Sequence, residues 1–85
     1  MRTLNVELIT PERTFLSTKA EFVVLPGISG DLGILPGHIS LTTLLKPGAM
    51  KLDIEGVQKR LIISTGIARV EPEFVKVFSP VIRYA

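Results

Sequence analysis

Apolar and polar residues alternate over several short stretches of this chain. Leu4, Val6 and Leu8 alternate with polar residues near the start, and the run 50–55 repeats the pattern more regularly. A period of two is typical of a β-strand that buries one face. No window of eleven residues places apolar residues at the spacing of a helix face. The pattern therefore predicts an all-β fold.

Turn residues recur about every ten positions and separate the expected strands. Residues 20–25 are apolar on both faces, which predicts a central strand, whereas residues 17–19 are interpreted as a bend. A hairpin is expected at Glu55-Gly56, and a further turn at residues 71–73. The expected strands cover residues 3–8, 13–16, 20–25, 30–35, 39–45, 50–55, 58–64, 67–71 and 74–78.

These short strands predict a small β-sandwich or flattened barrel, formed as a single domain by residues 1–85. A chain of 85 residues supports one modest core. Hydrophobic residues make up 46% of the chain and charged residues 21%, which excludes a disordered tail. The last residues, 79–85, are apolar but show no clear period.

The stretch 24–48 contains three Pro-Gly pairs and almost no charge. Each pair predicts a type II turn, because Pro sets φ at the second position of the turn and Gly accepts a positive φ at the third. Asp31 is the one charged residue within 22–45, and His38 is the one histidine of the chain. A neutral, turn-rich stretch is typical of a surface that is presented to a partner. The expected turn-forming residues are Pro26, Gly27, Gly33, Pro36, Gly37, Pro47 and Gly48.

Composition and charge exclude several classes of function. The net charge is +2, and basic and acidic residues are interspersed, so no basic stripe is available to bind nucleic acid. The chain has no cysteine, which excludes disulfides and thiolate metal sites. It lacks the apolar core of a signal peptide and any apolar run of about eighteen residues. We therefore expect a soluble protein without direct membrane insertion.

Asp31 and His38 are the candidates for catalysis or metal binding. A metal site needs three or four ligands, and no further histidine, cysteine or ligand spacing accompanies this pair. Gly27, Gly30 and Gly33 could cradle a phosphate only before a helix, and none is expected. The sequence therefore predicts no catalytic residue, metal or cofactor, and it favours a binding module within a larger assembly. The alternative is a small β-barrel enzyme or metal-binding module that uses Asp31 and His38.

A resemblance to a known family rests on three segments: ELITPERTFLS at 7–17, LPGISGDLGILPGHISLTTLLKPG at 25–48 and ISTGIARVEPEFVKVF at 63–78. They resemble the N-terminal domain of the epsilon subunit of F-type ATP synthases, called delta in mitochondria. The resemblance covers about residues 4–78 and implies a ten-stranded β-sandwich. It also implies a non-catalytic role in the central stalk, or rotor. There the domain docks the gamma subunit to the c-ring and couples proton or sodium translocation to ATP synthesis.

The same resemblance assigns residues to partners. Ile28, Ser29, Gly30 and Asp31 match the family loop that meets the c-ring, and the positions that match the face toward gamma are Thr10, His38 and Thr43. The chain ends in FSPVIRYA where many members continue into a helical hairpin that binds ATP. This departure from the family pattern implies no C-terminal helical hairpin and no nucleotide binding. It implies a peripheral location on the cytoplasmic face of the bacterial plasma membrane, or an equivalent coupling membrane.

Overall fold

The computed structural model describes residues 2–38 and 40–85, and these residues form ten β-strands and no helix. The expected all-β fold is therefore confirmed. In chain order the strands are β1 (Leu4–Ile9), β2 (Thr14–Ala20), β3 (Phe22–Gly27), β4 (Gly30–Ile34), β5 (Leu41–Leu45), β6 (Gly48–Ile54), β7 (Val57–Ile63), β8 (Gly66–Glu71), β9 (Phe74–Phe78) and β10 (Ile82–Tyr84).

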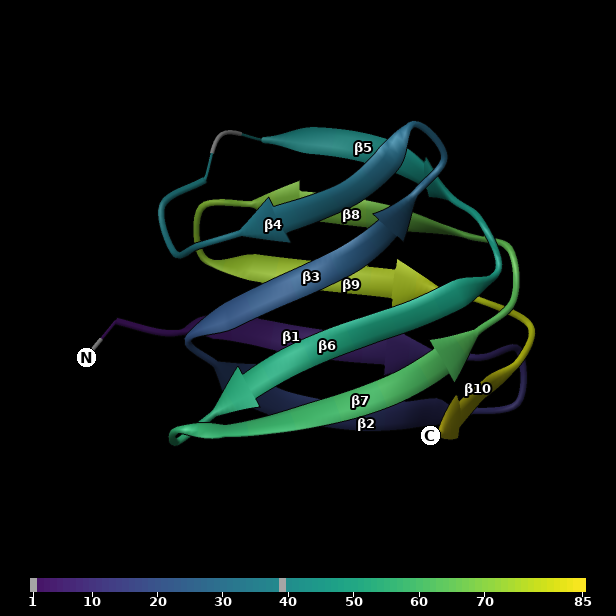
Figure 1. Ribbon diagram of the computed structural model, residues 1–85, viewed down its shortest axis with the longest axis horizontal. Coiled ribbons are helices and arrows are strands. Elements are labelled where there is room, and N and C mark those ends of the chain that lie inside the picture. Colours follow the sequence, from purple (N-terminus) through teal and green to yellow (C-terminus); the bar gives the residue numbers. More distant parts are fainter. Residues whose placement is uncertain (1, 39) are drawn as a thin grey trace.

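The strands form one continuous sheet that folds back on itself. Its order is β10-β7-β6-β3-β5-β8-β9-β1-β2, and β4 pairs with the remaining edge of β3. Figure 1 shows two layers, with β4, β3, β6 and β7 in front and β5, β8, β9, β1 and β2 behind. β3 joins the layers because it pairs with β6 along Phe22–Val24 and with β5 at Gly27. The result is the expected β-sandwich, or flattened barrel.

The core lies between the two layers and follows the period of two in the sequence. The largest side chains that are fully buried come from most of the strands. Burial of this apolar surface stabilises the fold by roughly 25 cal/mol for each Å² removed from water. The fully buried large residues are Leu4, Val6, Leu8, Val23, Leu25, Ile34, Met50, Leu52, Leu61, Ile63, Val70 and Val75.

Only one of the three Pro-Gly pairs forms the expected type II turn. At Pro36-Gly37 the amide of His38 donates to the carbonyl of Leu35 over 3.1 Å, and Gly37 has a φ of 87°. This geometry is that of a type II turn. The prediction for this pair is confirmed.

Pro26 and Gly27 are the last two residues of β3 and Gly33 lies within β4, so the turn-forming assignment is wrong for these three residues. The chain bends at Pro47, but Gly48 is already the first residue of β6. Among the described glycines a positive φ occurs at Gly30, Gly37 and Gly56. The remaining glycines are needed for close approach, which is the other reason for glycine in a strand.

Close approach is evident where two glycines meet other parts of the sheet. A Cβ atom on Gly27 would lie 2.7 Å from the carbonyl oxygen of Gly30, which closes the β3–β4 hairpin. A Cβ atom on Gly33 would lie 3.1 Å from the ring of Phe22. Both glycines therefore make room for neighbouring atoms inside the sheet.

Pro26 is tolerated inside β3 because of where its missing N–H would point. Its carbonyl accepts a hydrogen bond of 2.9 Å from the amide of Lys46, at the place where β3 changes partner from β6 to β5. The N–H and C=O of one strand residue point to the same side. The absent donor therefore falls at an interruption of the ladder, where a proline costs little.

Three further details of the sequence interpretation change. The bend expected at residues 17–19 is wrong, because β2 continues to Ala20 and the chain turns at Glu21. The tail contains a strand, β10, that its pattern did not predict. The strand expected from residue 39 begins at Leu41 in the part of the chain that the structure describes; Ile39 lies outside the described residues.

The hairpin expected at Glu55-Gly56 is confirmed and has an additional support. Glu55 and Gly56 have φ values of 50° and 79°, as in a type I′ turn. The Glu21 carboxylate accepts hydrogen bonds from the amides of Glu55 and Gly56, over 3.2 and 3.3 Å. Because φ > 0 is unusual for glutamate, this contact from a distant part of the chain helps hold the turn.

Candidate protein-docking surface

An apolar row crosses the outer face of the rear layer at one end of the sandwich. The strand register aligns one residue each from β5, β8, β9 and β1. A neighbour of each residue along its strand is buried, so the side chains of the row point out of the core. The apolar row consists of Leu44, Ile67, Phe78 and Ile9.

The β3–β4 turn extends this row toward the front layer. The amide of Ile28 donates to the carbonyl of Leu44 over 3.1 Å, which holds the turn against β5. Ile28 is 61% exposed, and Leu44, Ile67 and Phe78 are 53%, 43% and 45% exposed. Apolar side chains that are both exposed and contiguous indicate a surface that binds another protein.

A shallow apolar groove continues the row on the side of β1. Its lining residues are Ile9, Thr10, Pro11, Phe78, Ser79 and Pro80. The Thr10 hydroxyl donates to the carbonyl of Arg13 over 3.1 Å, so the turn after β1 forms a fixed wall of this groove.

Beneath the groove, two serines connect three loops. Ser79 is 3% exposed, and its Oγ lies 2.9 Å from Ser64 Oγ and 3.0 Å from the carbonyl oxygen of Thr65. Ser64 Oγ in turn accepts a hydrogen bond of 3.2 Å from the amide of Val81. The amide of Ser79 donates to the carbonyl of Ile9. This serine pair fixes the floor of the groove.

Charged residues replace the apolar ones at the opposite end of the same face. Lys76 lies 3.7 Å from Glu7, and Arg69 Nε donates to Glu71 over 2.8 Å. The Ser40 hydroxyl also donates to Glu71 over 2.6 Å. The hydroxyl of Ser40 and the guanidinium of Arg69 lower the pKa of Glu71 from its usual value. The rear face therefore has an apolar end and a charged end.

The four residues assigned to the c-ring lie together at the apolar end. Ile28 and Ser29 form the tip of the β3–β4 hairpin, and Gly30 and Asp31 are the first two residues of β4. All four are exposed. The structure brings this set together and joins it to the apolar row.

The three residues assigned to gamma are not brought together. β1 and β5 run in the same direction, so Thr10, which follows β1, and His38, which precedes β5, lie at opposite ends of the rear layer. Thr43 is half-buried and shares the inner side of β5 with the buried Leu45. Thr10 alone of the three lines the groove.

Asp31 and His38 do not form the pair that an enzyme or metal site would need. Asp31 stands at the beginning of β4, and His38 follows its far end, beyond a stretch of about 10 Å for three strand residues. The described residues contain no cluster of three or more side chains of the metal-binding types. No helix in the described part of the chain is long and apolar enough to cross a membrane.

The sequence interpretation missed the apolar row and the serine pair. A signal was present, because Leu44-Leu45 and Val77-Phe78 break the alternation with two apolar residues in succession at the ends of strands. In such a pair one side chain is buried and the other must face outward. The serine pair had no such signal, since Ser64 and Ser79 meet only after the strands have paired.

Comparisons with known proteins agree on one family. The model of the ATP synthase delta/epsilon chain beta-sandwich domain matches residues 3–83. The ATP synthase epsilon chain of Herminiimonas arsenicoxydans is 43% identical over 79 residues, which is 91% of this chain and 56% of that protein. The chain thus spans about half the length of this relative.

Solved structures share the fold. A chain in the cryo-EM structure of Euglena gracilis mitochondrial ATP synthase, with OSCP, F1 and c-ring, superposes with a TM-score of 0.92 at 21% identity. That match covers 99% of this chain and 54% of the other. A chain in the Tetrahymena thermophila mitochondrial ATP synthase central stalk and c-ring gives 0.77 at 15% identity, covering 93% and 64%.

Proposed function

The chain belongs to the family of ATP synthase delta/epsilon chain beta-sandwich domains, and we propose that it acts as a non-catalytic subunit of the central stalk. In this role it docks the gamma subunit to the c-ring, and it couples proton or sodium translocation to ATP synthesis. It is then peripheral, on the cytoplasmic face of the bacterial plasma membrane or an equivalent coupling membrane. No metal, cofactor or nucleotide takes part in this proposal.

The observation that carries this proposal is the continuity of the exposed apolar row with the β3–β4 turn. The amide of Ile28 donates a hydrogen bond to the carbonyl of Leu44, the first residue of the row that leads to Phe78 and the groove. A rotor component must transmit torque through contacts that stay fixed. One surface that runs from the turn to the groove can bind two neighbouring subunits at once without a flexible link.

The two parts of this surface have different partners in the proposal. Ile28, Ser29, Gly30 and Asp31 face the c-ring, and the apolar row with Thr10 faces gamma. The assignment of His38 and Thr43 to gamma requires that gamma also contacts β5 and the end of the rear layer opposite to Thr10. The short two-residue turn limits the conformations of the loop before binding, which lowers the entropy cost of docking.

The test is binding of purified gamma and of the purified c-ring to the domain and to single-residue variants. Phe78→Ala removes the aromatic ring of the row, and we expect gamma to bind about thirtyfold more weakly, as for a hot-spot residue. Val57→Ala is the matched control, because Val57 is 55% exposed at the β6–β7 hairpin, outside the row. Equal loss for both variants would contradict the assignment of the row to gamma.

The c-ring contact is tested with Asp31→Lys in reconstituted complexes. We expect the domain to remain folded, because Asp31 is exposed, and its association with the ring to weaken while gamma binding persists. His38→Ala tests the assignment of His38 to the gamma contact. We expect this variant to bind gamma more weakly while its association with the ring persists. If Asp31→Lys binds the ring and couples proton pumping normally, this loop does not contact the ring.

A further inference from the structure

The outer edge of β4 carries backbone groups without a partner strand. Within β3 the carbonyl of Pro26 points toward Lys46, away from β4. Its register partner on β4, Asp31, therefore has its own N–H and C=O on the side away from β3, and alternation gives the same direction for Gly33. Among the strands of the described residues, β4 pairs with β3 alone. Both residues are exposed, so these groups are accessible to another chain.

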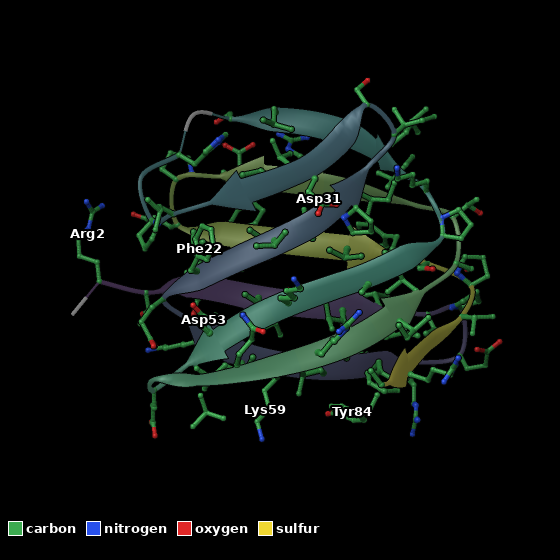
Figure 2. All side chains as sticks on the ribbon, in the orientation of Figure 1. Arg2, Phe22, Asp31, Asp53, Lys59 and Tyr84 are labelled. Carbon is green, nitrogen blue, oxygen red and sulfur yellow. The ribbon has the colours of Figure 1, made fainter. Side chains whose placement is uncertain are left out.

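Apart from the charge of Asp31, this edge lacks the protection that edge strands usually carry. Lysine, proline or a bulge normally prevents the pairing of an open edge with another chain. β4 has two glycines and an unbroken register with β3, and Asp31 is its one charged residue. The Phe22 ring covers Gly33 on the outer face, which orders the strand without blocking its edge. In Figure 2 Phe22 and Asp31 both lie on the front layer.

Apolar side chains surround the edge at both ends and on its inner side. Ile28 precedes β4 and is 61% exposed, and Leu35 follows it and is 59% exposed. Leu32 on β4 and Leu41 on β5 pack only partly against the core. Figure 1 shows β4 and β5 together at the top of the sandwich, where neither is followed by a further strand. A strand added there would bury this apolar surface.

We propose that the free edge of β4 binds an extended segment of a partner protein as an added antiparallel strand. The segment carries an apolar, a cationic and an apolar residue in succession. Residues opposite Leu32 and Gly30 point to the inner side, where an apolar side chain covers Leu32 and Leu41. The residue opposite Asp31 shares its outer face, where a lysine or arginine complements the carboxylate. A second copy of this chain fits less well, because β4 has no cation to offer Asp31.

This edge lies on the other side of the β3–β4 turn from the apolar row and shares Gly30 and Asp31 with the proposed c-ring contact, but the strand pairing requires neither gamma nor the c-ring as its partner. Failure of Phe78→Ala to affect gamma binding would therefore leave the β4 edge untouched. Conversely, an edge that binds no strand would leave the proposed function of the domain standing.

The probe is the peptide Ac-Thr-Thr-Val-Lys-Val-Thr-NH2, titrated into the ¹⁵N-labelled full chain and followed by NMR. The matched control is the same peptide N-methylated at the lysine and at the second threonine, whose amides face Asp31 and Gly33 in the added strand. We expect the unmodified peptide to shift the amide resonances of Asp31, Gly33 and Leu35, and the methylated peptide to leave them unchanged. Shifts that are equal for both peptides, or absent, would overturn the proposal.

Two variants test the charge complementarity. Asp31→Ala should weaken the peptide about two- to fivefold, the range of an exposed ion pair. Asp53→Ala is the control, because Asp53 lies on β6, which has paired strands on both sides, and peptide binding should not change. Resonances of β4 that shift with protein concentration alone would identify a second copy on the edge and would refute the partner segment proposed here.

Discussion

Removal of the Ser79 hydroxyl should destabilise the domain and loosen the floor of the groove. Ser79 is the buried polar residue of the described core, and its Oγ lies within 3.1 Å of three oxygens, those of Ser64, Thr65 and Val81. Ser79→Ala deletes the hydroxyl and leaves the backbone bond of its amide to Ile9 in place. The substitution therefore isolates the serine pair from the strand ladder.

The expected size follows from what the substitution leaves behind. A neutral hydrogen bond contributes about 1 kcal/mol, and an acceptor left buried without a donor costs about 1–3 kcal/mol. Ser64 Oγ keeps the amide of Val81 as a donor, and the carbonyl of the exposed Thr65 keeps a longer hydrogen bond of 3.4 Å from Ser64 Oγ. Each acceptor thus keeps one donor, and we expect a loss of about 1 kcal/mol. For a domain of this size 1 kcal/mol lowers the Tm by about 4–8 °C.

Calorimetry and urea unfolding of the wild type and three variants check this value. Ser17→Ala is the control, because Ser17 is exposed on β2 and should change stability by less than about 0.5 kcal/mol. Ser64→Ala and the double variant should be less than additive, since both serines belong to one network. If Ser79→Ala unfolds at the same urea concentration as Ser17→Ala, the serine pair does not stabilise the fold.

Three further predictions concern the core, the acid stability and the lack of nucleotide binding. Leu52→Ala, at a fully buried position, should cost about 2–5 kcal/mol in urea unfolding, and a cost below about 1 kcal/mol would contradict its burial. Because Ser40 and Arg69 lower the folded pKa of Glu71 from 4.5, Glu71 stabilises the fold above that pH, and this contribution is lost as the pH falls through the lower folded pKa. In the Glu71→Gln variant the free energy of unfolding should therefore fall less steeply as the pH is lowered from about 6 to about 3. An unchanged pH dependence would contradict this role of Glu71. Calorimetric titration with ATP and Mg²⁺ should give no heat of binding, since the chain has no phosphate-binding loop followed by a helix in its described part, and a micromolar Kd would be the contrary result.

The fold could be predicted from local pattern because most strands bury only one face. The alternation around Leu52 and around Val6 identifies those strands, and Gly56 signals the turn that follows β6. The prediction of strands failed where contacts between residues far apart in the sequence determine the structure. The continuity of β2 through residues 17–19 follows from its register with β1, and β10 forms because β7 offers an edge.

The candidate site was less predictable, because it forms only when the strands pair. Leu44, Ile67, Phe78 and Ile9 are far apart in the sequence and become neighbours through four strands. The Pro-Gly pairs show that a clear local signal can also be ambiguous. A Pro-Gly pair allows a type II turn, but it does not state whether the glycine serves a positive φ, as at Gly37, or a close approach inside a strand.

The parallel pairing of β1 with β9 determines the order in which this chain can fold. β1 aligns Val6 with Val75 of β9, so the second edge of β1 stays uncovered until a strand much later in the sequence has been made. Until then the β1–β2 hairpin exposes Val6 and Leu8 beside an open edge, which favours aggregation of nascent chains. Closure over so long a loop is slow for the size of the domain. We therefore expect this pairing to be the late, rate-limiting event of folding.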